Sequence, residues 1–212
     1  CFLVAPKRKG DMLRSAYEAG GGAPGVLAFT PASPPETWPL CAAYARAVGC
    51  LRGGGWSTTF REECVSDQFG ELAVLCGGVI ELLQAAFDTL TDRGYDATNA
   101  YFECVHELKL ITDLLHRHGL EGMRRRISPT AAYGGLTRGP RLIDASVRRR
   151  MEDILDEIED GRFAREFLAR HDDPEAGVQA LAARESTTRL AGIGRELQAR
   201  LRNLDPGAPG TD

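Results

Sequence analysis

The stretch that decides the fold is SDQFGELAVLCGG, residues 66–78. Its apolar residues recur at helical spacing, and its two acids, Asp67 and Glu71, are four residues apart. In an α-helix this spacing puts both carboxylates on one face, one turn apart, where they repel each other when ionised. The stretch therefore predicts an apolar helix whose acids need a cation or hydrogen-bond donors.

A second stretch, YFECVHELKL at residues 101–110, repeats the pattern with Glu103 and Glu107. Carboxylate oxygens without Cys or His partners favour Mg²⁺ over zinc or copper. A solvated helix face is the usual explanation of one such pair, whereas two pairs in apolar helices are also typical of a metal site. Spacing alone leaves both interpretations open.

Upstream of these stretches, residues 1–60 are rich in Gly and Pro and differ in character from the rest. Short apolar runs at 1–5 and 25–29 predict buried strands, and the apolar spacing at 36–48 predicts a helix ended by Gly49. The order strand, strand, helix is typical of the end of an α/β unit.

Downstream, the periodicity predicts helices throughout. They are expected at 67–89 with a break at Gly77–Gly78, at 99–118 ended by Gly119, and at 146–159, 162–171 and 176–204. Residues 205–212 have too little apolar surface to order themselves, and we expect a disordered tail there. The predicted fold is mainly α, preceded by the remnant of an α/β domain.

Composition argues against several classes of protein. The chain has 212 residues, 43% of them hydrophobic, and a formal net charge of −4 without a basic stripe, so no binding to nucleic acid is expected. The apolar stretches are interrupted well short of the roughly 20 residues of a membrane span, and no signal peptide is visible. We therefore expect a cytoplasmic protein without a membrane partner. Its 6 cysteines lack the spacing of a zinc site and are predicted to be buried free thiols.

The chain resembles the short-form (class I) ketol-acid reductoisomerases in motifs that follow that family's order and approximate spacing. Besides residues 66–78, these are VAPK (4–7), SAYEAGGGAPG (15–25), TTFREE (58–63), YFECVHELKLITDLL (101–115) and GPRLID (139–144). The resemblance implies a helical, knotted C-terminal domain at 61–204. It also implies that 1–60 are the last strands and one helix of a Rossmann-type NADPH-binding domain.

The resemblance further implies a reaction. Family members shift an alkyl group within an acetohydroxy acid and reduce the product with NADPH, while two Mg²⁺ ions polarise the substrate oxygens. By position, Asp67 would bridge the two ions and Glu71 would bind one of them. Glu103 and Glu107 match acids that come from the partner subunit, so a homodimer with shared active sites, or a larger oligomer, is implied.

Two further residues match the family's site. Ser128 would hydrogen-bond the substrate carboxylate, and Lys7 would lie beside the metal ions and their bound water. Lys7 and Glu107 are the expected catalytic groups.

The chain also departs from the family. Residues 6–11 are PKRKGD where PKGPGH is usual, and Arg126 replaces a serine two residues before Ser128. GGGAPG at 20–25 formally fits a nucleotide fingerprint, but it precedes a predicted strand and contains Pro24, so we predict a turn. Because the chain opens at Cys1 within an apolar run, we expect a fragment that lacks the NADPH site and the family's catalytic histidine.

Two other functions stay open. A stand-alone relative without the Rossmann domain would act as a metal-dependent isomerase or lyase on a related hydroxy-keto acid, which the altered PKRKGD and RRISP segments favour. A non-catalytic dimeric scaffold would keep the fold alone.

Overall fold

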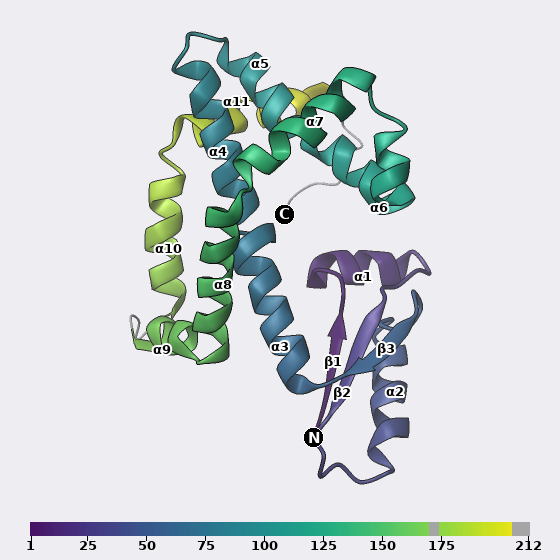
Figure 1. Cartoon of the computed structure of the whole chain (residues 1–212). Coiled ribbons are helices and arrows are strands. Elements are labelled where there is room, and N and C mark those ends of the chain that lie inside the picture. The colour runs from purple at the N-terminus through teal and green to yellow at the C-terminus, as the bar shows by residue number, and fades with distance from the viewer. Residues whose placement is uncertain (170–173, 205–212) are drawn as a thin grey trace. The chain divides into compact units, whose positions relative to one another are not determined.

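The computed structural model describes residues 1–169 and 174–204, and it divides into two compact units, Cys1–Gly70 and Glu71–Asp212. The first unit is built on a sheet of order β1-β2-β3, visible in Figure 1. β1 (Phe2–Pro6) pairs antiparallel with β2 (Gly25–Phe29), and β2 pairs in parallel with β3 (Gly55–Thr58). A parallel pair needs a crossover, which α2 (Thr37–Ala47) supplies.

The core of this unit forms between β2 and α2. Alternate residues of a strand face the same side, so Leu27 and its register partner Val4 point together toward the helix. There they pack against the fully buried Cys41, Ala45 and Cys50. The predicted strands at 1–5 and 25–29 and the predicted helix at 36–48 are therefore confirmed, with small shifts at their ends.

Two elements of the first unit were not predicted. Helix α1 (Gly10–Glu18) has a short apolar face of Leu13, Ala16 and Tyr17 that was overlooked, whereas β3 is exposed or half-buried along its length and has no alternating apolar pattern. Backbone pairing with β2 holds β3 in place. The predicted turn at 20–25 is confirmed, because these residues connect α1 to β2 and Gly20 has a φ of 81°.

Helix α3 (Phe60–Phe69) begins earlier than the predicted start at residue 67. The Thr59 side chain accepts a hydrogen bond from the Glu62 backbone N–H at 3.0 Å, which satisfies one of the unpaired amides of the first turn. Helix α3 contacts β2, and the compact unit that contains both extends to Gly70.

The second unit is helical throughout its described residues. Its elements in chain order are η1 (Gly70–Leu75, begun in the last residue of the first unit), α4 (Gly78–Thr91), α5 (Ala97–Tyr101), η2 (Phe102–His106), α6 (Leu108–Arg124), α7 (Pro129–Leu142), α8 (Ala145–Glu159), α9 (Arg162–Ala169), α10 (Pro174–Glu185) and α11 (Arg189–Leu204). Its core is formed by Phe87 of α4, Ala100 and Tyr101 of α5, and Leu197 of α11. Figure 1 shows these helices, and the prediction of a mainly α fold after an α/β remnant is confirmed.

Several helix boundaries were wrong. The predicted helix at 67–89 contains the π-helix η1, and the one at 99–118 contains the π-helix η2. The predicted end at Gly119 is confirmed, because Gly119 has a non-helical φ of 66°, and a second helix follows across this kink to Arg124 within α6. The predicted helix at 176–204 is two helices separated at 186–188.

Helix α7 was missed, because its three glycines and Pro140 lower its helix propensity. Parts of the predicted helix at 162–171 and the whole predicted tail at 205–212 lie outside the described residues.

Candidate metal and substrate site

Lys7 follows β1 and lies between two acids of α3. Its Nζ is 2.5 Å from Glu63 Oε1 and 3.6 Å from Asp67 Oδ1. Glu63 and Asp67 are four residues apart, so they lie one turn apart on α3 and both reach the amine. The structure thus brings two predicted site residues, Lys7 and Asp67, together, while their roles stay predictions.

Glu63 is the site residue that sequence reasoning missed. It is only 7% exposed and is the buried charged residue of the part of the chain that the structure describes. A carboxylate taken out of water needs a charged or hydrogen-bonded partner, and Lys7 provides it. A signal for it existed, because Glu63, Asp67 and Glu71 continue one series of acids at intervals of four.

Glu71 is half-buried and lies in η1, where the backbone leaves the α-helical register. Its carbonyl accepts hydrogen bonds from the backbone N–H groups of Cys76, at 2.9 Å, and Gly77, at 3.2 Å. These donors are five and six residues further along the chain, whereas an α-helix bonds the fourth. Glu71 therefore begins a widened turn, and the geometry of its pair with Asp67 stays a prediction.

Glu103 and Glu107 are both exposed and lie at η2. The Glu107 backbone N–H donates to the Phe102 carbonyl, five residues earlier, at 3.0 Å. Between the acids, burial and the Glu103 charge raise the pKa of the Cys104 thiol. One acid of each predicted pair, Glu71 and Glu103, thus lies in a π-helical segment, and such segments are rare and frequently found at functional sites.

Ser128 is the N-cap of α7. Its Oγ accepts a hydrogen bond from the Ala131 backbone N–H at 3.1 Å. A hydroxyl that accepts in this way still has its own proton to donate, for instance to a carboxylate. The side chain is exposed, so a ligand can reach it.

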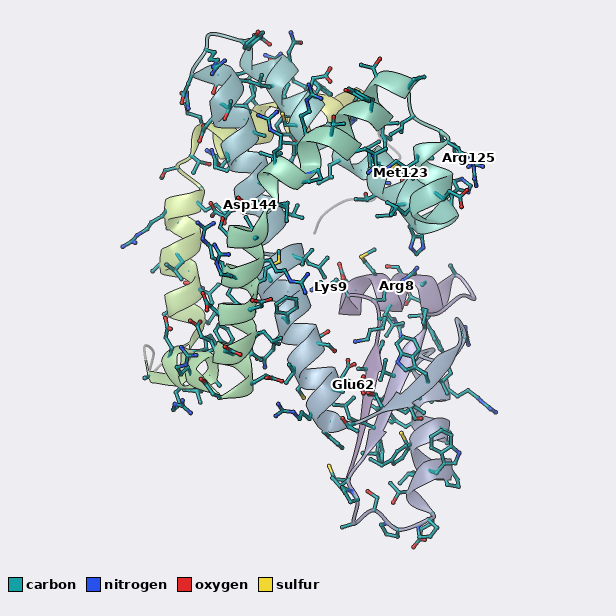
Figure 2. The ribbon with its side chains drawn as sticks, viewed as in Figure 1. Arg8, Lys9, Glu62, Met123, Arg125 and Asp144 are labelled. Carbon is teal, nitrogen blue, oxygen red and sulfur yellow. The ribbon has the colours of Figure 1, made fainter. Side chains whose placement is uncertain are left out.

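The arginines before Ser128 are used locally. Arg126 donates to the Gly122 carbonyl at 3.0 Å and Arg124 to the Ala132 carbonyl at 3.5 Å, while Arg125, labelled in Figure 2, pairs with Glu121. These contacts support the interpretation of residues 124–126 as a charged surface and not as a binding site for the substrate carboxylate.

The unusual PKRKGD segment places extra positive charge next to Lys7. Arg8 and Lys9, labelled in Figure 2, are both exposed, and Lys9 is the N-cap of α1. Positive charge concentrated at one place favours the approach of anionic ligands. The segment therefore suits an acidic substrate.

One chain does not gather all the predicted acids. Within residues 1–169 and 174–204, no group of three or more His, Cys, Asp and Glu side chains is arranged to hold a metal ion. The Asp67 side chain is 57% exposed in the single chain. The predicted convergence of four acids concerns two copies of the chain, and it stays a prediction.

The predicted apolar surroundings of the acids are present, but solvent reaches them. Leu75 of η1 is 67% exposed and Leu82 of α4 is 48% exposed. By length and composition, the helical stretch Phe60–Thr91 could cross a membrane. Only 6% of its most apolar window is buried within the chain. The expectation that every apolar stretch is too short was wrong for this one.

The cysteine prediction was right about free thiols and partly wrong about burial. All six are free, yet only Cys41 and Cys50 are buried. Burial raises the pKa of both of these thiols. Cys64 and Cys76, which neighbour the predicted acids, are exposed.

Comparisons with known proteins agree with this arrangement. Residues 60–203 match the family model for the ketol-acid reductoisomerase C-terminal domain, and residues 1–54 match that for the acetohydroxy acid isomeroreductase NADPH-binding domain. A ketol-acid reductoisomerase (NADP(+)) of Kineococcus radiotolerans is 45% identical over 196 residues, which cover 92% of this chain and 57% of that protein.

A solved structure gives the same result. The NADH-preferring ketol-acid reductoisomerase from an uncultured archean has a TM-score of 0.87 at 35% identity, covering 93% of this chain and 60% of that chain. The chain therefore spans less than two thirds of the length of both relatives.

Proposed function

This chain belongs to the ketol-acid reductoisomerase family, and from that premise we propose that it forms the Mg²⁺- and substrate-binding part of such an enzyme. The observation that supports this most is the contact of Lys7 with Asp67, secured by the buried Glu63. In this proposal Asp67 would bind Mg²⁺, which polarises a substrate oxygen, and Lys7 would hold a hydrogen-bond donor beside that ion.

The metal site of this proposal has four acids. Asp67 and Glu71 come from one copy of the chain, and Glu103 and Glu107 come from the other. Carboxylate oxygens are hard donors, so this set fits Mg²⁺. When bound, two such ions would polarise the oxygens of the acetohydroxy acid.

The remaining residues of the site would act on the substrate directly. Lys7 would donate a hydrogen bond to a substrate oxygen or to a metal-bound water beside Asp67. Ser128 would donate its hydroxyl proton to the substrate carboxylate. Glu107 would exchange a proton with a substrate hydroxyl. Arg8 and Lys9 raise the local concentration of the anionic substrate.

We also propose that the functional form is an interlocked, knotted homodimer with shared sites, or an oligomer built from it, in the cytoplasm. The exposed apolar side chains of η1 and α4 support this, because large exposed apolar surfaces usually mark an interface. A second copy would cover them and would bring its acids to the site.

NADPH is the proposed hydride donor of the whole protein, since the Kineococcus radiotolerans relative has NADP(+) in its name. Residues 1–54 match the NADPH-binding domain of the family. NADPH oxidation by this chain with acetolactate and Mg²⁺ measures whether these residues suffice for the reduction. Rearrangement of acetolactate without NADPH would favour the stand-alone isomerase, which the altered PKRKGD segment supports.

Calorimetric titration with Mg²⁺ tests the proposal. We expect wild type to bind, and Asp67→Asn to bind at least about tenfold more weakly. Asp153→Asn, which removes an exposed acid of α8, should bind like wild type. No metal-dependent heat from the wild-type chain would contradict the proposal and favour a non-catalytic scaffold.

A further inference from the structure

The two π-helical segments end differently. In η1, the N–H groups of Cys76 and Gly77 both bond the Glu71 carbonyl, and Gly78 begins the next helix. In η2, Glu107 takes the place of Cys76, and the residues that correspond to Gly77 and Gly78 are Leu108 and Lys109, which have side chains. A π-helical turn therefore does not need glycine in general, and the glycines at η1 require a separate explanation.

That explanation is steric. A Cβ on Gly77 would lie 2.0 Å from the Leu72 carbonyl oxygen, and a Cβ on Gly78 would lie 2.2 Å from the Ala73 carbonyl oxygen. Real Cβ atoms essentially never approach another atom closer than 3.0 Å. Because both oxygens belong to the backbone of η1 itself, neither can rotate away as the tip of a side chain would.

Backbone conformation does not explain the glycine at 77. Gly77 has a φ of −98° and a ψ of −76°, and a negative φ is open to residues with side chains. The widened turn brings the carbonyl oxygens of Leu72 and Ala73 close to residues 77 and 78. It is this approach that excludes a Cβ at the two positions. The glycine pair and the π-helical turn therefore depend on each other.

We propose that Gly77 and Gly78 are positioning residues that hold η1 in its π-helical register and so set the direction in which Glu71 leaves the helix. This inference rests on the proposed function, in which Glu71 binds Mg²⁺. A return to α-helical bonding would change the register by one residue. That change would turn Glu71 by about 100° relative to α4, too far for it to bind the same ion.

Gly77→Ala tests this by Mg²⁺ titration, with thermal unfolding of the metal-free chain measured alongside. We expect at least about a tenfold loss of Mg²⁺ affinity. The matched control is Gly192→Ala in α11, where a new Cβ meets no atom within 4 Å. This control should bind like wild type. Wild-type affinity in Gly77→Ala would overturn the inference, whereas no binding by wild type would overturn the proposed function itself.

A second variant decides the matter if Gly77→Ala unfolds. Deleting Val74, a 41% exposed residue of η1, from the Gly77→Ala chain removes the extra residue and lets α-helical bonding resume with room for the alanine. The Glu71 carbonyl would then accept from the Cys76 N–H, its present partner, in an α-helical bond, so Glu71 would keep its direction relative to α4. We expect this chain to fold and to bind Mg²⁺ with an affinity near that of wild type. Loss of Mg²⁺ binding by the folded chain would contradict the inference. So would a failure to fold, which would show that η1 is needed for the core to fold instead of for the direction of Glu71.

Discussion

Among single residues, the ion pair between Lys7 and Glu63 is the contact from which the candidate site is built. Removing Lys7 would leave a buried carboxylate without its partner, whereas removing both charges would not. We expect Lys7→Met to lower the free energy of unfolding by about 2 kcal/mol. The double variant Lys7→Met/Glu63→Gln should lose less than Lys7→Met alone. Urea unfolding measures both, and strictly additive losses would contradict a direct coupling of the two groups.

Thiol reactivity gives a second prediction for individual residues. Cys41 and Cys50 are buried, and burial raises the pKa of each, so little thiolate is available to react. In a labelling time course followed by mass spectrometry, we expect Cys64 to be modified in the folded chain and Cys41 and Cys50 only after unfolding. Rapid modification of Cys41 in the folded chain would show that the core between β2 and α2 is open.

The resemblance implied Lys7 beside the metal-binding acids, because the motifs that carry it contain Lys7 and Asp67. The spacing of the acids could have signalled Glu63, but its burial could not be predicted, because that depends on how α3 packs on β2.

Within the elements, the start of α8 shows how a cap responds to pH. The Asp144 carboxylate, labelled in Figure 2, accepts hydrogen bonds from the Ser146 hydroxyl and from the backbone N–H groups of Ser146 and Val147. These bonds hold the pKa of Asp144 below its ordinary value, with the Ser146 hydroxyl as the largest cause. The stabilisation is therefore complete above the unfolded pKa and is lost as the pH falls through the lower, folded pKa.

We accordingly expect Asp144→Ala to unfold at a lower temperature than wild type at neutral pH. The difference should shrink as the pH falls through the depressed pKa of Asp144. Asp144→Asn, which keeps the capping oxygen, should lie between the two. Thermal unfolding followed by circular dichroism across pH measures this, and a difference that stays constant from neutral to acidic pH would contradict the assignment.

The π-helical segments could not be predicted from the sequence, because an amphipathic period near 3.6 is compatible with one inserted residue. The glycine pair after Leu75 was interpreted only as a helix break, and its steric reason appears once the Leu72 and Ala73 carbonyls are placed. Helix α7 was signalled by Ser128 followed by Pro129, a common N-cap and first-turn combination, yet its glycines obscured it.

For the whole molecule, the apolar stretch Phe60–Thr91 is the feature that a single chain leaves unexplained. An interlocked dimer accounts for it, because the second copy would cover η1 and α4. We expect the chain to remain dimeric without detergent in light-scattering measurements, and Leu82→Arg on α4 to shift it toward monomer. Tyr95→Arg, which alters a 63% exposed residue beyond that stretch, is the control and should remain dimeric. A requirement for detergent would contradict the dimer.

Sharing of the site between two copies is the central claim, and purified mixed dimers test it most directly. Asp67→Asn and Glu107→Gln dimers should each fail to bind Mg²⁺, since every site in them lacks one acid. A dimer with one chain of each kind should bind at half the wild-type stoichiometry, because one of its sites has all four acids. If the mixed dimer, like the two single-variant dimers, bound no Mg²⁺ while wild type did, the account would be contradicted.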